Sequence, residues 1–76
     1  MTALSELPFG AAAQVTEVAG VDEITMRLLE MGLTPGVNIV LVGAAPLGDP
    51  LEIELRGYRL SLRRSEADRV QVAVLA

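Results

Sequence analysis

The 76-residue sequence predicts a mostly β fold, in which five short strands close a small barrel and one short α-helix is inserted after the first strand. Apolar and polar residues change their pattern about every eight to twelve positions, a spacing typical of small β-barrels and sandwiches. Glycine or proline stands at most of the breaks, where turns are needed. The chain has room for one domain, which we expect to comprise residues 1–76.

The first strand is expected at residues 13–19, and the one convincing helix begins after Asp22. A carboxylate at this position can accept hydrogen bonds from the first free amides of a helix. Two apolar rows follow at the spacings expected for the faces of a helix. The first row is Ile24, Leu28 and Met31, with Val21 before the cap on the same face, and the second is Met26, Leu29 and Leu33. We expect one row to pack against the barrel.

Four glycines are predicted to shape turns. Gly32 falls where a left-handed residue commonly ends a helix, and Pro35 prevents the helix from continuing. Gly57 would supply the positive φ that a tight hairpin turn requires. Gly36 and Gly48 lie in the connections before and after the second strand, which we expect at residues 37–42.

The clearest element is a β-hairpin after the second strand. Apolar residues alternate with polar or charged ones on both sides of Arg56-Gly57, which we expect to form a two-residue turn. A slip of one residue would bury the charges, so the alternation specifies the register. The predicted apolar pairs are Leu55 with Tyr58, Ile53 with Leu60, and Leu51 with Leu62, and Glu54 lies opposite Arg59 on the other face.

The C-terminal part is expected to complete the barrel. Residues 65–68 are predicted to form a short capped turn, and Val70, Val72 and Val74 alternate in the last strand. Because the connections are short, we expect the last four strands to pair in sequence order as an antiparallel meander, which the first strand closes. A five-stranded SH3-like barrel with an inserted helix meets these conditions, and its closure would hide the sheet edges.

The composition excludes several classes of function. The chain has neither Cys nor His, so it lacks the usual nucleophiles, general bases and transition-metal ligands. Two pairs of neighbouring acids, Asp22 with Glu23 and Glu66 with Asp68, provide too few ligands for a tight cation site. A net charge of −4 disfavours nucleic acid, and no phosphate-binding glycine-lysine motif is present. We therefore expect no enzyme, no metal and no cofactor.

The sequence also bears on the location of the protein. Residues 1–6 lack the basic and apolar regions of a signal peptide. The longest apolar run, at residues 39–47, is much shorter than the roughly 20 residues that span a membrane. We expect a cytoplasmic protein without direct membrane insertion.

A protein contact is the remaining function. The mean hydropathy of +0.46 is high for so short a chain, and a small domain can bury only part of its apolar surface. The outer helical row and the following turn are the candidate contact, at Met26, Leu29, Leu33 and Pro35. Alternatively, a short helix in a barrel groove buries both rows. The loop at residues 46–50 is a second candidate, although proline and glycine also fix turns regardless of function.

Three segments resemble one known family. Residues 27–36, RLLEMGLTPG, are similar to the signature of FeoA, a small protein of bacterial ferrous-iron transport. Residues 4–15, LSELPFGAAAQV, resemble the opening of that family, and residues 45–72, APLGDPLEIELRGYRLSLRRSEADRVQV, resemble its second half. The resemblance runs from about Leu4 to Val74.

The resemblance implies a partner. Members of the FeoA family are thought to act from the cytoplasm on FeoB, a membrane protein with a GTP-binding domain and a ferrous-iron permease. The implied function is a non-enzymatic accessory protein that binds FeoB and modulates or assembles it. Two alternatives remain: a structural module that self-associates as a homo-oligomer, or a free-standing relative of the C-terminal domain of metal-dependent transcriptional repressors.

Overall fold

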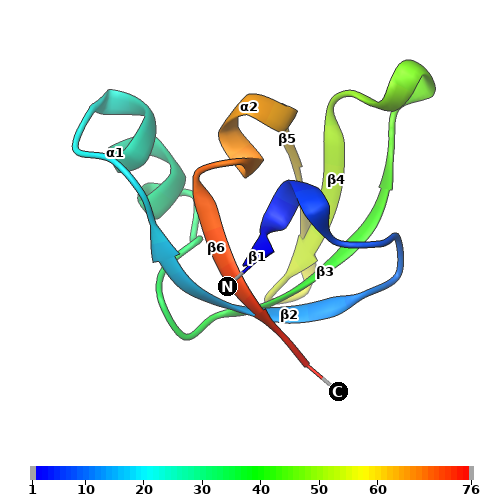
Figure 1. Cartoon of the computed structure of the whole chain (residues 1–76), viewed down its shortest axis with the longest axis horizontal. Helices are drawn as coiled ribbons and strands as arrows, with labels where there is room; N and C mark the ends of the chain where they lie inside the picture. Colours follow the sequence, from blue (N-terminus) through cyan, green and yellow to red (C-terminus); the bar gives the residue numbers. More distant parts are fainter. Residues whose placement is uncertain (1, 76) are drawn as a thin grey trace.

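In the computed structural model, which describes residues 2–75, the chain forms one antiparallel sheet of six strands in the order β1-β6-β2-β3-β4-β5. The sheet is strongly curved, with α1 and α2 beside it (Figure 1). The five predicted strands and the predicted helix are all present. The strands are β1 (Thr2–Ala3), β2 (Ala12–Val18), β3 (Asn38–Ala44), β4 (Leu51–Leu55), β5 (Tyr58–Leu62) and β6 (Val70–Val74). The helices are α1 (Glu23–Glu30) and α2 (Arg64–Ala67), with 3-10 turns η1 (Leu4–Glu6) and η2 (Pro46–Gly48).

The predicted pairing of the last strand is wrong. Strands β3, β4 and β5 form the expected meander, but β6 pairs with β2 and β1 and not with β5. The helical turn α2 carries the chain away from β5, and β6 crosses to the other end of the sheet (Figure 1). There Val72 lies opposite Val15, and both are buried. The short connection between β5 and β6 therefore does not make them neighbours in the sheet, because the position of β6 depends on its packing in the core.

The β4–β5 hairpin has the predicted register. Leu55 lies opposite Tyr58, Ile53 opposite Leu60 and Leu51 opposite Leu62. Glu54 lies opposite Arg59, and their Oε2 and Nε atoms are 3.7 Å apart. Arg56 and Gly57 both have positive φ, as a type I′ turn requires. All four predicted turn glycines, Gly32, Gly36, Gly48 and Gly57, have positive φ.

The buried core consists of aliphatic side chains from every strand except the short β1. Within α1, only Thr25 and Leu28 are buried. Ile24, which was expected to pack in the core with Leu28, is 36% exposed, so this part of the predicted row is wrong. No helix among residues 2–75 is long and apolar enough to span a membrane. The core residues are Leu4, Leu7, Ala13, Val15, Leu28, Leu33, Val37, Ile39, Leu41, Leu51, Ile53, Leu55, Leu62, Ala67, Val70 and Val72.

Candidate interaction surfaces

The start of α1 is held by a hydrogen-bonded cluster around Asp22. This residue caps the helix as predicted: its Oδ1 accepts a hydrogen bond from the Thr25 amide at 3.1 Å. The same oxygen accepts from Arg69 Nη1 at 2.6 Å, which links the helix to the turn before β6. The Arg69 hydrogen bond, followed by that of the Thr25 amide, lowers the pKa of Asp22 from 3.8 to about 2. The carboxylate of Asp22 therefore fixes the start of the helix.

The rest of α1 is held by α2 and the hairpin. Arg27 pairs with Glu66 of α2, whose carboxylate also accepts a hydrogen bond from the Arg63 amide at 2.9 Å. Tyr58, the first residue of β5, donates its hydroxyl hydrogen to the Met31 carbonyl oxygen at 2.7 Å. The helix is thus attached to three parts of the barrel, although it contributes few residues to the core.

The predicted contact residues of α1 have different environments. Met26 is 58% exposed and Pro35 is exposed, but Leu29 is half-buried. Leu33 is fully buried and cannot contact a partner, so this assignment was wrong. After Gly32 the chain leaves the helical path and returns to the core, so helical spacing no longer describes the position of Leu33.

Two apolar residues near α1 are exposed, although they were expected on the same face as the buried Leu28. Val21, just before the cap, is fully exposed, and Ile24 is 36% exposed. Val21 precedes the cap, where the backbone of Asp22 is extended, so helical spacing does not describe its position. We define the α1 surface as Met26 and Leu29, which are three residues apart in the helix and lie on one side of it.

A second exposed region lies at the η2 loop between β3 and β4. Leu47 is fully exposed and has a φ of 77°, although leucine rarely adopts this left-handed conformation. Arg64 holds the loop: its Nε donates to the Gly48 carbonyl oxygen at 2.7 Å, and its backbone amide donates to Asp49 Oδ1 at 3.1 Å. This loop was the second predicted candidate, although the exposure of its leucine was not predicted.

A groove of about 210 Å³, lined by polar as well as apolar side chains, lies beside Arg64. Its floor includes the buried residues Leu7, Leu41 and Leu51. Phe9, which is 61% exposed, and Arg64 also line it. We call this the end groove. The sequence did not predict it, because it joins residues from segments far apart in the chain.

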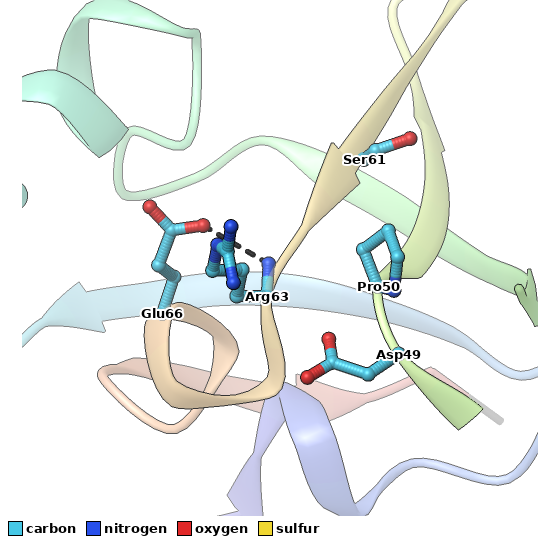
Figure 2. A pocket seen from close by; sticks show the side chains of 5 residues that line it. All are labelled: Asp49, Pro50, Ser61, Arg63 and Glu66. Carbon is cyan, nitrogen blue, oxygen red and sulfur yellow. Dashed lines mark hydrogen bonds between the residues drawn. The ribbon is translucent and has the colours of Figure 1, made fainter. Parts of the chain in front are cut away.

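Figure 2 shows another hollow, lined by Asp49, Pro50, Ser61, Arg63 and Glu66. Its two carboxylates do not point toward a common position, and the Ser61 hydroxyl points away from both (Figure 2). Each carboxylate already accepts a backbone hydrogen bond, from the Arg64 amide and the Arg63 amide respectively. Among residues 2–75, no group of three or more acids could hold a metal ion. Both carboxylates therefore hold the backbone at the start of α2.

Comparison with known proteins identifies relatives over almost the whole chain. The model of the FeoA domain family matches residues 2–74. A Porphyromonas gingivalis protein named as a fusion of Fe(2+) transport protein A and the Fe(2+) transporter FeoB is 38% identical over 73 residues. The match covers 96% of this chain but 9% of the fusion protein, so this chain spans a small part of that relative.

Solved structures agree with this assignment. FeoA from Chlorobium tepidum is 41% identical, with a TM-score of 0.90 over 99% of this chain and 71% of that protein. A zinc complex of FeoA from Stenotrophomonas maltophilia, described as a procaryotic SH3 domain protein, is 38% identical, with a TM-score of 0.84 over 96% of this chain and 91% of that one. A manganese-dependent transcriptional repressor shares the fold alone, at 13% identity and a TM-score of 0.88 over 97% of this chain and 36% of the repressor. The predicted SH3-like barrel is confirmed, and the chain belongs to the FeoA domain family.

Proposed function

We propose that this chain is a non-enzymatic accessory protein of ferrous-iron transport, which binds the cytoplasmic part of a FeoB-type GTPase and permease. The observation that carries the proposal is the Porphyromonas gingivalis fusion, in which a related segment is joined to a transporter named FeoB. Covalent linkage gives two domains a high effective concentration, which favours even a weak contact between them. A separate accessory chain would make the same contact between molecules.

The α1 surface is the proposed contact with this partner. Its apolar side chains are exposed on a helix whose start and end are both held to the barrel, at Asp22 and Met31. A preorganised surface loses less conformational entropy on binding than a mobile one. Met26 is suited to such a contact because its flexible thioether side chain adapts to different apolar partners. Pro35, which is also exposed, remains a candidate in the turn after the helix.

The residue chemistry supports a binding role over catalysis. The chain contains no Cys or His, and the lowered pKa of Asp22 follows from a helix cap and an arginine partner. Catalytic groups usually have shifted pKa values within a cleft, whereas Asp22 is one of the groups that fix α1. The likeness to the repressor is a likeness of fold, and no role in transcription is proposed from it.

The test is a calorimetric titration with the matching FeoB-type protein, both at full length and as its GTP-binding domain, in each nucleotide state. Wild type is compared with Met26→Glu and with a control, Val74→Glu. The two replaced side chains are similarly exposed, Met26 at 58% and Val74 at 57%. We expect Met26→Glu to weaken binding by about tenfold or more, because a charge would be buried at the contact. Val74→Glu should bind as wild type does.

Two results would contradict the proposal at different levels. If folded wild-type protein binds neither the full-length FeoB-type protein nor its GTP-binding domain in any nucleotide state, the transporter is not the partner. If both glutamate variants bind as tightly as wild type, the partner is right but the α1 surface is not the site. GTP hydrolysis measured in the same samples would distinguish an effect on the enzyme cycle from an effect on assembly.

A further inference from the structure

Strand β5 is the last strand of the sheet, and one of its edges is open. It pairs with β4 on one side, and no strand follows it in the sheet order. Because Leu55 and Tyr58 flank the two-residue turn, alternate residues of β5 exchange hydrogen bonds with β4, and the backbone groups of Arg59 and Ser61 point away from it. Within residues 2–75, no backbone group of another segment bonds to Arg59 or Ser61. Such unpaired amides and carbonyls can pair with a further strand.

The open edge ends where α2 begins. The Arg63 amide, two residues after Ser61, also points away from β4, but it donates to Glu66 Oε1 at 2.9 Å. The Glu66 carboxylate thereby occupies the position that a carbonyl oxygen of an added strand would take. At the other end of β5, the Tyr58 hydroxyl bonds to the Met31 carbonyl oxygen at 2.7 Å. The edge that remains for an added segment is therefore residues 58–62.

The side chains beside this edge form two rows of different chemistry. On the outer face, the side chain of Arg59 is 61% exposed, and Ser61 is exposed with it. Arg63 is also exposed and lines the same hollow as Ser61 (Figure 2). On the inner face, Leu60 is partly buried against the core. A strand added at this edge would place one row of its side chains beside arginines and the other beside leucine.

Strand β4 shows which sequence suits β5 as a neighbour. Its residues, LEIEL, alternate aliphatic side chains with glutamate, and Glu54 Oε2 lies 3.7 Å from Arg59 Nε. A guanidinium has several N–H donors, so Arg59 can bind a second carboxylate from its open side. Arg63 forms no ion pair within residues 2–75, so its charge is also available. A second copy of this chain is a poor occupant, because its β5 would bring arginines beside arginines.

We propose that the open edge of β5 binds an extended acidic segment of another protein, in which glutamate or aspartate alternates with apolar residues. The backbone of the segment would pair with Arg59 and Ser61, its carboxylates would lie beside Arg59 and Arg63, and its apolar side chains would pack on Leu60. In strand addition of this kind, main-chain hydrogen bonds supply affinity and alternate side chains supply specificity. The α1 surface contributes no residue to this site.

The test is an amide NMR titration of the full chain with a synthetic capped peptide of about seven residues, in which glutamate alternates with valine. In the free protein, the Arg59 and Ser61 amides should exchange quickly with solvent, whereas the Leu60 amide, which is bonded to β4, should exchange slowly. The peptide should shift the resonances of residues 58–62 and slow the exchange of both outward amides. A peptide with lysine in place of glutamate should bind at least about tenfold more weakly, because like charges would meet.

Three variants separate the backbone contribution from the charge contribution. Ser61→Pro removes the outward amide and leaves the hydrogen bonds to β4 in place, so it should abolish binding. Ser61→Ala, its matched control, keeps the amide and should bind as wild type does. Arg59→Gln keeps the edge open but removes a charge, so it should weaken binding of the glutamate peptide by about fivefold and leave the lysine peptide no weaker. Circular dichroism establishes that each variant is folded.

Several results would overturn the proposal. Slow exchange of the Arg59 and Ser61 amides in the free protein would show that the edge is not open. Absence of binding at millimolar glutamate peptide, equal affinity for the lysine peptide, or normal binding by folded Ser61→Pro would each do the same. Shifts in β5 that depend on protein concentration alone would show that a second copy occupies the edge. Met26→Glu should bind the peptide as wild type does, so the transporter proposal is tested separately.

Discussion

The β4–β5 hairpin and α1 are both amphipathic, but they are related to the core in different ways. In the hairpin, alternate residues point to opposite faces, and burial follows the alternation at Leu51, Ile53 and Leu55. In α1, apolar residues occupy several sides of a single helix, and only Leu28 among them is buried. The comparison shows that a strand pattern assigns each residue to one of two faces, whereas a helix pattern leaves the docking angle open.

The largest expected effect tests which residues face the core. Leu28→Ala in α1 and Ile53→Ala in β4 should each lower the free energy of unfolding by about 2–5 kcal/mol, because both side chains are fully buried. Ile24→Ala, in the same predicted row as Leu28, should lower it by about 1 kcal/mol or less. Urea unfolding followed by circular dichroism measures all three. An equal loss for Ile24 and Leu28 would mean that α1 docks at a different angle.

The next largest expected effect tests the contact between the β4–β5 hairpin and the end of α1. A Cβ at Gly32 would lie 2.7 Å from the Tyr58 hydroxyl, whereas a Cβ at Gly36 would meet nothing within 4 Å. Both glycines have positive φ, so either substitution to alanine should cost about 1–3 kcal/mol from backbone strain. Gly32→Ala should cost about 1 kcal/mol more, because Tyr58 must move and lose its hydrogen bond to Met31.

Thermal unfolding of Gly32→Ala and Gly36→Ala, each combined with Tyr58→Phe, tests whether the Tyr58 hydroxyl causes the extra loss of stability at Gly32. Phenylalanine lacks the hydroxyl that blocks the alanine side chain at position 32, so the difference between Gly32→Ala and Gly36→Ala should shrink. A difference that persists unchanged would show that the two regions are not coupled through this hydroxyl.

A smaller effect concerns the start of α1. The folded-state pKa of Asp22 is about 2, below its ordinary value of 3.8, so folding favours the charged carboxylate. Its contribution to stability is present above pH 3.8 and is lost as the pH falls toward 2. Wild type should therefore lose more stability over this range than Asp22→Asn, which can still cap the helix. Parallel pH profiles of urea unfolding for the two proteins would contradict this role.

The smallest effect concerns the outer face of the hairpin. Glu54 and Arg59 face one another as the alternation predicted, but their side chains are 51% and 61% exposed. Glu54→Gln should change the free energy of unfolding by less than about 0.5 kcal/mol, because water screens an exposed ion pair. Chemical denaturation measures the change. A loss above about 1 kcal/mol would indicate that charge pairing helps to set the register, beyond the burial of the apolar face.

Much of the fold could be predicted from local patterns. The hairpin register, the Asp22 cap and the four turn glycines each depend on neighbouring residues, and all are confirmed. The strand β1 was missed because two residues cannot show an alternation. Glu23 lies four residues before Arg27 in α1, but the ion pair of Arg27 in the fold is with Glu66. The sequence around Arg27 does not indicate which of the two carboxylates lies closer to its guanidinium.

The candidate surfaces were less predictable than the fold. Met26 was correctly placed at the surface, but Leu33 is in the core, and Val21, expected on the same face as Leu28, is exposed. The end groove escaped prediction because Leu7, Leu41 and Leu51 are brought together only by strand pairing and the turns between strands. Exposure of an apolar residue depends on what the rest of the chain covers, which a short segment of sequence does not contain.

By itself, the sequence determined the class of fold, the hairpin and its register, the helix with its cap, and membership of the FeoA family. These properties follow from residue spacing, from turn chemistry and from the motifs of residues 27–36 and 45–72. The tertiary structure alone decided that β6 lies between β1 and β2, that Leu33 is buried, and that Leu47 is exposed. These features depend on contacts between distant segments, since the core is filled by whichever elements together exclude water from the most apolar surface.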